Sequence, residues 1–311
     1  MIFFVVLLFV VVSMPSVAQE STDKSNGVRQ MKTPRLSINA DFSVRPGGDY
    51  YVTKDDAIIE SGNSGAFSKA SVKASYAFLS KGATRLSVNA GYSHLRQEYD
   101  GIVKTFDHGL QKKSHHYMSC GLMGMTRLKL WDKPLMVVAF LNTDLSENGY
   151  ERWSAMGTAM LMLKQTRDTQ LGVGVVGLIH TFSKIPIILM ASYRHVFNPH
   201  WTINLTLPRY QMEYRPGKNS VWNVGAGIEA DSYYLNTCGD GLPSNVRYSR
   251  SNVNVGPGYA YTFPNGFKLN LEGGVQFVMT NRIYNSGTST ELAGFHEKTA
   301  PYLHVGIQKQ F

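Results

Sequence analysis

The sequence predicts an all-β protein, a single transmembrane, antiparallel up-and-down β-barrel of about 12 strands, with about 14 as the alternative. Three observations lead to this fold class. Apolar and polar residues alternate with period two in a series of segments. A short apolar run stands near the start of the chain. The last segment also alternates, and it ends on the aromatic residue Phe311.

The start of the chain predicts a secretory signal peptide. An apolar run, Ile2–Val12, is followed by the small residues Ser16–Ala18. The run is shorter than the ~20 residues that a membrane-spanning helix needs. No Lys or Arg precedes the run, which is its main departure from such a signal. The expected division is therefore a signal peptide at 1–18, a polar periplasmic linker at 19–34 and a barrel at 35–311.

The alternating segments have the length of membrane-spanning strands. Leu36–Val44 and Ala70–Phe78 are typical, and tilted spanning strands have ~10 residues. A soluble β-sandwich would alternate as well, but its strands average about 5–6 residues. A Lys or Arg that faces lipid at the membrane midplane costs roughly 2–4 kcal/mol. The polar faces, which contain Lys73 and Glu272, are therefore expected to line the lumen.

Turns and tryptophans fit the same fold. Short turns such as Pro264–Gly266 alternate with long polar loops such as Pro46–Gly65 and Asn281–Thr299, which is the habit of barrels. The tryptophans lie close to predicted strand ends, where membrane interfaces favour aromatic side chains. They are Trp131, Trp153, Trp201 and Trp222.

The number of candidate strands is odd, which shows that one strand assignment is wrong. Thirteen segments qualify as strands, whereas a bacterial barrel has an even number. The alternation of turns and loops places the error between residues 114 and 232, near Lys184–Pro186 or Leu207–Pro208. We expect twelve strands rather than fourteen.

Charged residues of both signs are expected in the lumen. They could pair into a network that fills the barrel, or they could line a wet, mildly anion-favouring channel. Filling becomes harder as the strand number grows, because larger barrels leave space. The charged residues assigned to the lumen are Lys69, Lys73, Arg85, Arg194, Lys268, Asp41, Glu229 and Glu272.

Some middle strands are apolar on both faces. The alternation assigns Met136, Phe140, Met156 and Met160 to the lumen as an apolar wall. Such a wall could guide a hydrophobic solute, since methionine adapts to irregular ligands. Two alternatives stay open, an inward plug that packs there or a register shifted by one residue.

No motif predicts catalysis, and we expect no enzyme, cofactor or metal site. Gly172–Gly177 matches a dinucleotide-binding fingerprint, but it lies inside a strand instead of before a helix. His115–His116 lacks further ligands at metal-binding spacing. No His is followed two residues later by Ser, although a catalytic triad split along the chain remains open.

The cysteines and the net charge give two further expectations, one about disulfides and one about nucleic acid. Cys120 and Cys238 do not make a disulfide framework, and we favour two free thiols. The net charge of +9 comes from scattered basic residues, which argues against nucleic acid as a partner.

The signal end, the strand pattern, the Leu207–Pro208 break and the terminal Phe311 together resemble uncharacterised outer-membrane β-barrel proteins of the Bacteroidota. The resemblance implies the outer membrane as location, with its lipid, its lipopolysaccharide and the barrel-assembly machinery as partners. It also implies that Phe311 is an assembly signal. It brings no catalytic or binding residues.

A passive channel or porin for small solutes is the expected function. The alternatives are a structural or surface-interaction barrel with ligand-binding extracellular loops, and a transporter of a hydrophobic solute. Conduction should depend on the lumen charges, so Lys73→Glu or Arg85→Glu should shift ion selectivity toward cations.

Overall fold

The computed structural model describes six stretches of the chain: 35–97, 114–146, 149–179, 187–236, 245–285 and 290–311. The predicted signal peptide 1–18 and linker 19–34 lie outside these residues and stay predictions. Cys238 also lies outside them, so its expected free thiol stays a prediction. Within the described stretches, no helix has the length and apolar character needed to cross a membrane.

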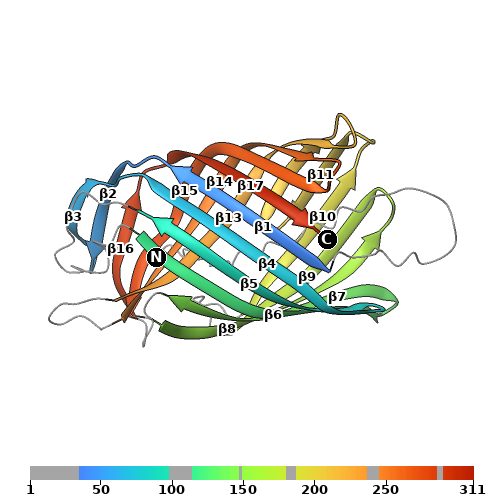
Figure 1. The fold of residues 1–311 in the computed structure, drawn as a ribbon, viewed down its shortest axis with the longest axis horizontal. Helices are drawn as coiled ribbons and strands as arrows, with labels where there is room; N and C mark the ends of the chain where they lie inside the picture. The colour runs from blue at the N-terminus through green and yellow to red at the C-terminus, as the bar shows by residue number, and fades with distance from the viewer. Residues whose placement is uncertain (1–34, 98–113, 147–148, 180–186, 237–244, 286–289) are drawn as a thin grey trace.

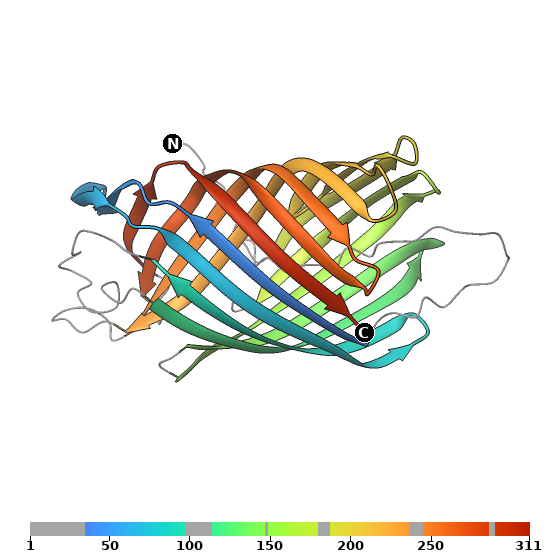
Figure 2. The same ribbon diagram turned by 45° about the horizontal axis from the view of Figure 1, so that its top comes forward.

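Fourteen antiparallel strands form a closed barrel (Figure 1). Each barrel strand pairs with its neighbours, and the last closes on the first through pairs such as Asp41↔Gly306. Figure 2 shows all of them tilted in the barrel wall. The strands are β1 (Leu36–Arg45), β4 (Phe67–Lys81), β5 (Thr84–Arg96), β6 (Ser114–Leu130), β7 (Lys133–Ser146), β8 (Gly149–Gln165), β9 (Thr169–Ile179), β10 (Ile187–Val196), β11 (Trp201–Thr206), β12 (Arg209–Tyr214), β13 (Ser220–Asn236), β14 (Asn245–Thr262), β15 (Phe267–Asn285) and β17 (Ala300–Gln310).

The expected count of twelve strands is wrong, and the alternative of fourteen is right. Eight barrel strands, β6 to β13, lie in the region where parity placed the error. Two of them, β11 and β12, have only six residues each and flank the turn at Leu207–Pro208. Such strands are shorter than the ~10 residues expected of a spanning strand. The alternation pattern therefore did not count them as two separate strands.

Three further strands stand at one end of the barrel, at the left of Figure 1. They are β2 (Asp49–Lys54), β3 (Ala57–Asn63) and β16 (Glu291–Glu297). β16 extends the sheet from β15 and pairs with β2 through Phe295↔Val52, and β2 pairs with β3. The segments Pro46–Gly65 and Asn281–Thr299, expected to be polar loops, therefore contain strands. We call this end the loop end and the opposite one the turn end.

The outward face of the barrel is apolar. On β1, Phe42 is 46% exposed, and on β17 Leu303 is 50% exposed. Asp41 and His304 alternate with them and face the lumen, where they approach each other. The four tryptophans are exposed near strand ends, with Trp131, Trp201 and Trp222 at the turn end and Trp153 nearer the loop end. An apolar belt edged by aromatic side chains is the surface that spans a bilayer.

Candidate functional site: the lumen

Ion pairs cross the lumen between strands that are not neighbours. Lys69 on β4 pairs with Asp231 on β13. Four strands, β1, β17, β15 and β14, lie between these two in the wall. Arg209 on β12 likewise pairs with Glu272 on β15, with a second contact of 2.7 Å from Nη2 to Oε2. These pairs tie one side of the barrel to another, so they act as cross-braces.

The remaining charged residues assigned to the lumen lie on the same side, except Arg194 on β10. Lys73 stands among Lys69, Asp231, Asp41 and Glu229. On β15, Lys268 lies near Glu213 and Glu272 and close to two arginines. Arg85 shares the inward face of β5 with the fully buried Ser87, and Arg194 on β10 lies opposite Gln170 and Asn204. We call this surface, formed by β11–β15, β17, β1, β4 and β5, the polar wall.

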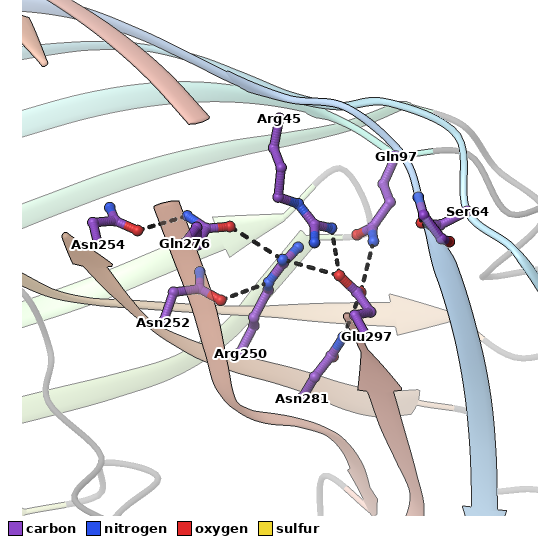
Figure 3. A network of polar contacts seen from close by, with 10 residues as sticks. Arg45, Ser64, Gln97, Arg250, Asn252, Asn254, Gln276, Asn281 and Glu297 are labelled. Carbon is purple, nitrogen blue, oxygen red and sulfur yellow. Dashed lines mark hydrogen bonds and ion pairs between the residues drawn. The ribbon is translucent and has the colours of Figure 1, made fainter. Parts of the chain in front are cut away.

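Glu297 on β16 is the centre of a buried polar network at the loop end (Figure 3). Its carboxylate pairs with Arg45 and with Arg250, the latter at 3.1 Å. Gln97 and Asn281 donate further hydrogen bonds to it, of 3.3 and 2.8 Å. The side chains of Arg45, Glu297 and Arg250 are 3%, 2% and 1% exposed. The network therefore joins β16 to β1, β5, β14 and β15.

Two guanidinium groups keep the Glu297 carboxylate ionised. Burial alone would raise the pKa of Glu297, but Arg250 and Arg45 together lower it below the ordinary value. Arg250 is itself held by Asn252 at 3.0 Å. Sequence reasoning missed Glu297 because it placed the residue in a loop. The alternation of Ala293, Phe295 and Glu297 along one face of β16 was the available signal.

An apolar cluster adjoins this network at the loop end of the lumen. It joins β2 and β16 to β4 and β5 on one side and to β13, β14 and β15 on the other. Phe67 lies under the guanidinium of Arg250, 4.9 Å from ring centroid to carbon. We call this cluster together with β2, β3 and β16 the plug. Its buried members are Tyr50, Val52, Phe67, Leu95, Tyr233, Val246, Tyr248, Ile283, Ala293 and Phe295.

The opposite side of the lumen is an apolar wall on β7–β10. On β9, buried Val176 and Leu178 alternate with exposed Val175 and Ile179, so the buried pair faces inward. Met160 lies opposite Met136 on β7 and Gly174 on β9. The structure brings together on this wall all four apolar residues that the sequence assigned to it. The lumen-facing side chains are Met136, Val138, Phe140, Met156, Met160, Met162, Val176, Leu178, Ile188 and Met190.

A glycine makes room for the methionines of the apolar wall. A Cβ atom on Gly172 would approach Met162 Sδ to 3.1 Å and Met160 Cγ to 3.2 Å. Both sulfur-containing side chains can therefore lie flat against β9. The fingerprint-like Gly172–Gly177 lies within this strand, and its first glycine serves packing.

The barrel wall is incomplete beside the apolar wall. β11 pairs with β10 only from Ser192 to Val196, and β12 pairs with β13 only as far as Gly227. Toward the loop end, the stretches Ile187–Ala191 of β10 and Glu229–Asn236 of β13 have no described strand between them. Ile188 and Met190 of the apolar wall lie on the first of these edges.

The other predicted residues lie apart from the two lumen walls. The amide of Phe311 donates a 2.8 Å hydrogen bond to the Leu36 carbonyl at the turn end. Cys120 is a free thiol on the outward face of β6. His115 faces inward and stacks on Tyr233, with 5.6 Å between ring centroids, whereas His116 faces outward. Within the described residues no three His, Cys, Asp or Glu side chains gather as a metal site.

Comparisons with known proteins leave the family open. No family model and no curated protein matches the chain. Among solved structures, an outer membrane channel from Pseudomonas putida F1 is 10% identical, with 93% of this chain and 100% of that one covered and a TM-score of 0.44. A FadL homologue from Pseudomonas aeruginosa is 10% identical over 89% of each chain, with a TM-score of 0.39. The toluene transporter TodX from P. putida is 10% identical over 89% and 90%, with a TM-score of 0.36. Scores of this size say nothing about which solute this chain binds.

Proposed function

We propose that this protein is an outer-membrane barrel that passes a hydrophobic solute along its apolar wall. The observation that carries the proposal is the cluster of lumen-facing apolar side chains on β8–β10, which includes Met160 and Met190. Small-molecule sites are lined mostly by apolar side chains with a few polar groups. Methionine fits solutes of varied shape because it is unbranched and polarisable.

The outer membrane is the location that the chain supports best. Its outward face is apolar and its tryptophans lie near the strand ends, as in barrels that span a bilayer. The predicted signal peptide would bring it across the inner membrane. With short turns toward the periplasm, the plug lies on the side that faces the medium.

The incomplete wall offers the solute a way out. β10 has 10 residues and β13 has 17, but the hairpin between them has strands of six. An apolar molecule that reaches Ile188 and Met190 is thus beside the edge of β10. Passage from this edge into the bilayer would keep the solute out of water, which the hydrophobic effect favours.

A passive porin for small polar solutes is less well supported. Such a pore needs a wet path along the whole lumen, and the plug places apolar side chains such as Val52 and Phe295, each almost fully buried, inside the loop end. The polar wall does not require conduction for its pairs to form, because Lys69 with Asp231 and Arg209 with Glu272 satisfy one another across the lumen. The small-solute porin therefore remains a prediction that is not confirmed.

Uptake by proteoliposomes tests the proposed function. We expect purified barrel to speed entry of a monoaromatic hydrocarbon and to leave permeability to a monosaccharide unchanged. Met160→Gln with Met190→Gln should reduce hydrocarbon entry about tenfold, the effect of about 1.4 kcal/mol. The matched control is Asn270→Gln, a lumen-facing change on the polar wall. Entry of the sugar without the hydrocarbon would overturn the proposal and favour the porin.

A further inference from the structure

The hairpin between β6 and β7 places a tryptophan where the backbone favours glycine. Its two turn residues, Trp131 and Asp132, have φ angles of 50° and 59°. Two other hairpins at the turn end, β4–β5 and β14–β15, have Gly82 and Gly266 at φ angles of 58° and 81°. A bulky residue with positive φ is uncommon and costs free energy, so such a residue points to a role beyond the turn. The Trp131 side chain is 78% exposed, so packing inside the protein does not supply that role.

Two lysines lie beside this tryptophan on the outward face of the barrel. Lys133 lies opposite Leu130 across the turn. Its Nζ donates a 3.0 Å hydrogen bond to the Leu163 carbonyl on β8. Lys164 follows Leu163 in the chain and lies opposite Leu171, which is on the outward face of β9. Both lysines are exposed, so two positive charges stand on neighbouring strands at the turn end.

Apolar side chains lie next to these lysines, toward the middle of the bilayer. Leu128 and Leu130 are 51% and 38% exposed on the outward face of β6, and Leu128 lies opposite Leu135 on β7. Lysines at such a boundary lay their apolar stems along the apolar surface and keep the ammonium group among the lipid headgroups. Tryptophan is enriched at the same level of a membrane. The surface therefore has the profile of one lipid, with charge at the rim and apolar side chains below it.

The positive charge is confined to one part of the turn end. Between β6 and β9 the basic residues at this end are Lys129, Lys133, Lys164 and Arg167, and the acidic ones are Asp132 and Asp168. Among the described residues, neither Lys133 nor Lys164 forms an ion pair with a carboxylate. The β10–β11 and β14–β15 turns, residues 197–200 and 263–266, contain no Asp, Glu, Lys or Arg.

We propose that the turn end of β6–β8 binds the headgroup of an anionic phospholipid from the leaflet at that end. The phosphate accepts hydrogen bonds from Lys133 and Lys164, which each have three N–H donors. The acyl chains lie along Leu128 and Leu130, and Trp131 lies at the level of the glycerol. A zwitterionic lipid fits less well, because its headgroup brings a positive charge of its own next to the lysines. The site uses only the outer surface, so it does not depend on a solute path through the lumen.

Fluorescence quenching by spin-labelled lipids tests the site locally. The protein would keep Trp131 as its only tryptophan, with Trp153, Trp201 and Trp222 replaced by phenylalanine. It would be refolded into phosphatidylcholine vesicles that contain a small fraction of spin-labelled phosphatidylglycerol or of spin-labelled phosphatidylcholine. We expect phosphatidylglycerol to bind beside Trp131 about fivefold more strongly than phosphatidylcholine, as a lysine near an anionic headgroup predicts.

The preference should depend on the two lysines. In the Trp131 protein, Lys133→Gln with Lys164→Gln should bring the ratio of the two binding constants close to one. Lys133→Glu with Lys164→Glu should reverse it in favour of phosphatidylcholine, because like charges repel. The matched control, Lys54→Gln with Lys218→Gln, removes two exposed charges elsewhere and should leave the ratio unchanged. An equal fall in this control would assign the preference to the net charge of the protein and overturn the proposal.

A second tryptophan at the same end serves as the matched position. Trp201 begins β11, directly after the uncharged β10–β11 turn, and is 38% exposed. A protein with Trp201 as its only tryptophan should be quenched equally by both lipids. Equal quenching of Trp131 by both lipids, the same preference at Trp201, or a ratio unchanged by the Lys133 and Lys164 substitutions would overturn the proposal.

Discussion

The two walls of the lumen differ in what their side chains contact. On the polar wall, charged groups such as Lys69 and Asp231 find each other across the interior. On the apolar wall, Met160, Val176 and Met190 belong to one cluster of apolar side chains. A paired charge has its partner already and needs no solute, whereas an apolar molecule that enters among these side chains stays out of water. The contrast supports the proposal that the paired lumen charges brace the barrel and that the methionines line the path of the solute.

The largest effect is expected at the plug. Glu297→Ala leaves Arg45 and Arg250 buried without their carboxylate, and breaking a buried pair in this way costs about 3–5 kcal/mol. The free energy of unfolding in urea, followed by tryptophan fluorescence, measures it. Ion conductance in planar bilayers should rise as the loop end loosens. A Glu297→Ala protein with unchanged ion conductance and unchanged stability would contradict this account of the plug.

On the apolar wall, Met160→Ala should cost about 2–3 kcal/mol, because it leaves a cavity among buried side chains. Urea unfolding measures this as well. Asn270→Ala, a lumen-facing change on the polar wall, is the matched control and should cost less. If both substitutions cost the same, the two walls would not differ in packing.

On the polar wall, the Lys69–Asp231 pair should show strong coupling. Lys69→Met alone leaves Asp231 without its partner, whereas Lys69→Met with Asp231→Leu removes both charges. A double-mutant cycle should therefore give a coupling energy of about 1–2 kcal/mol. Additive single effects would show that the two residues do not brace the barrel.

Acid should release the plug only at low pH. The pKa of Glu297 is lowered in the folded protein, so its contribution to stability is complete above the ordinary glutamate pKa of about 4.3 and is lost as pH falls through the lower folded value. Conductance of wild type should thus stay constant from pH 7 to about pH 5 and rise only below about pH 4. Glu297→Gln should abolish that rise, and a rise near pH 6 would point to histidine instead.

The smallest effect is expected at the plug's surface. Lys298 pairs with Asp49, but their side chains are 75% and 59% exposed. Exposed ion pairs contribute little because water and salt screen them. Lys298→Ala should therefore unfold at the same urea concentration as wild type, and a clear shift would show that β2 depends on this pair.

Period-two alternation made the barrel predictable, since it fixes which side of each strand meets lipid. It was enough to assign Met156 and Met160 to the lumen. It could not give the strand number, because β11 and β12 are shorter than the length that defined a strand. It did not find Glu297 either, because the short alternation of β16 stood in a segment expected to be a loop, and its pairing with β2 joins segments far apart in the chain.

Crystals soaked with a brominated monoaromatic compound test the central claim most directly. Anomalous scattering from bromine would locate the bound molecule without reference to activity. The account predicts a peak inside the barrel, in contact with Met160 and Met190 on the apolar wall. A peak confined to the polar wall beside Lys73 and Glu229, or none inside the barrel at saturating concentration, would contradict it.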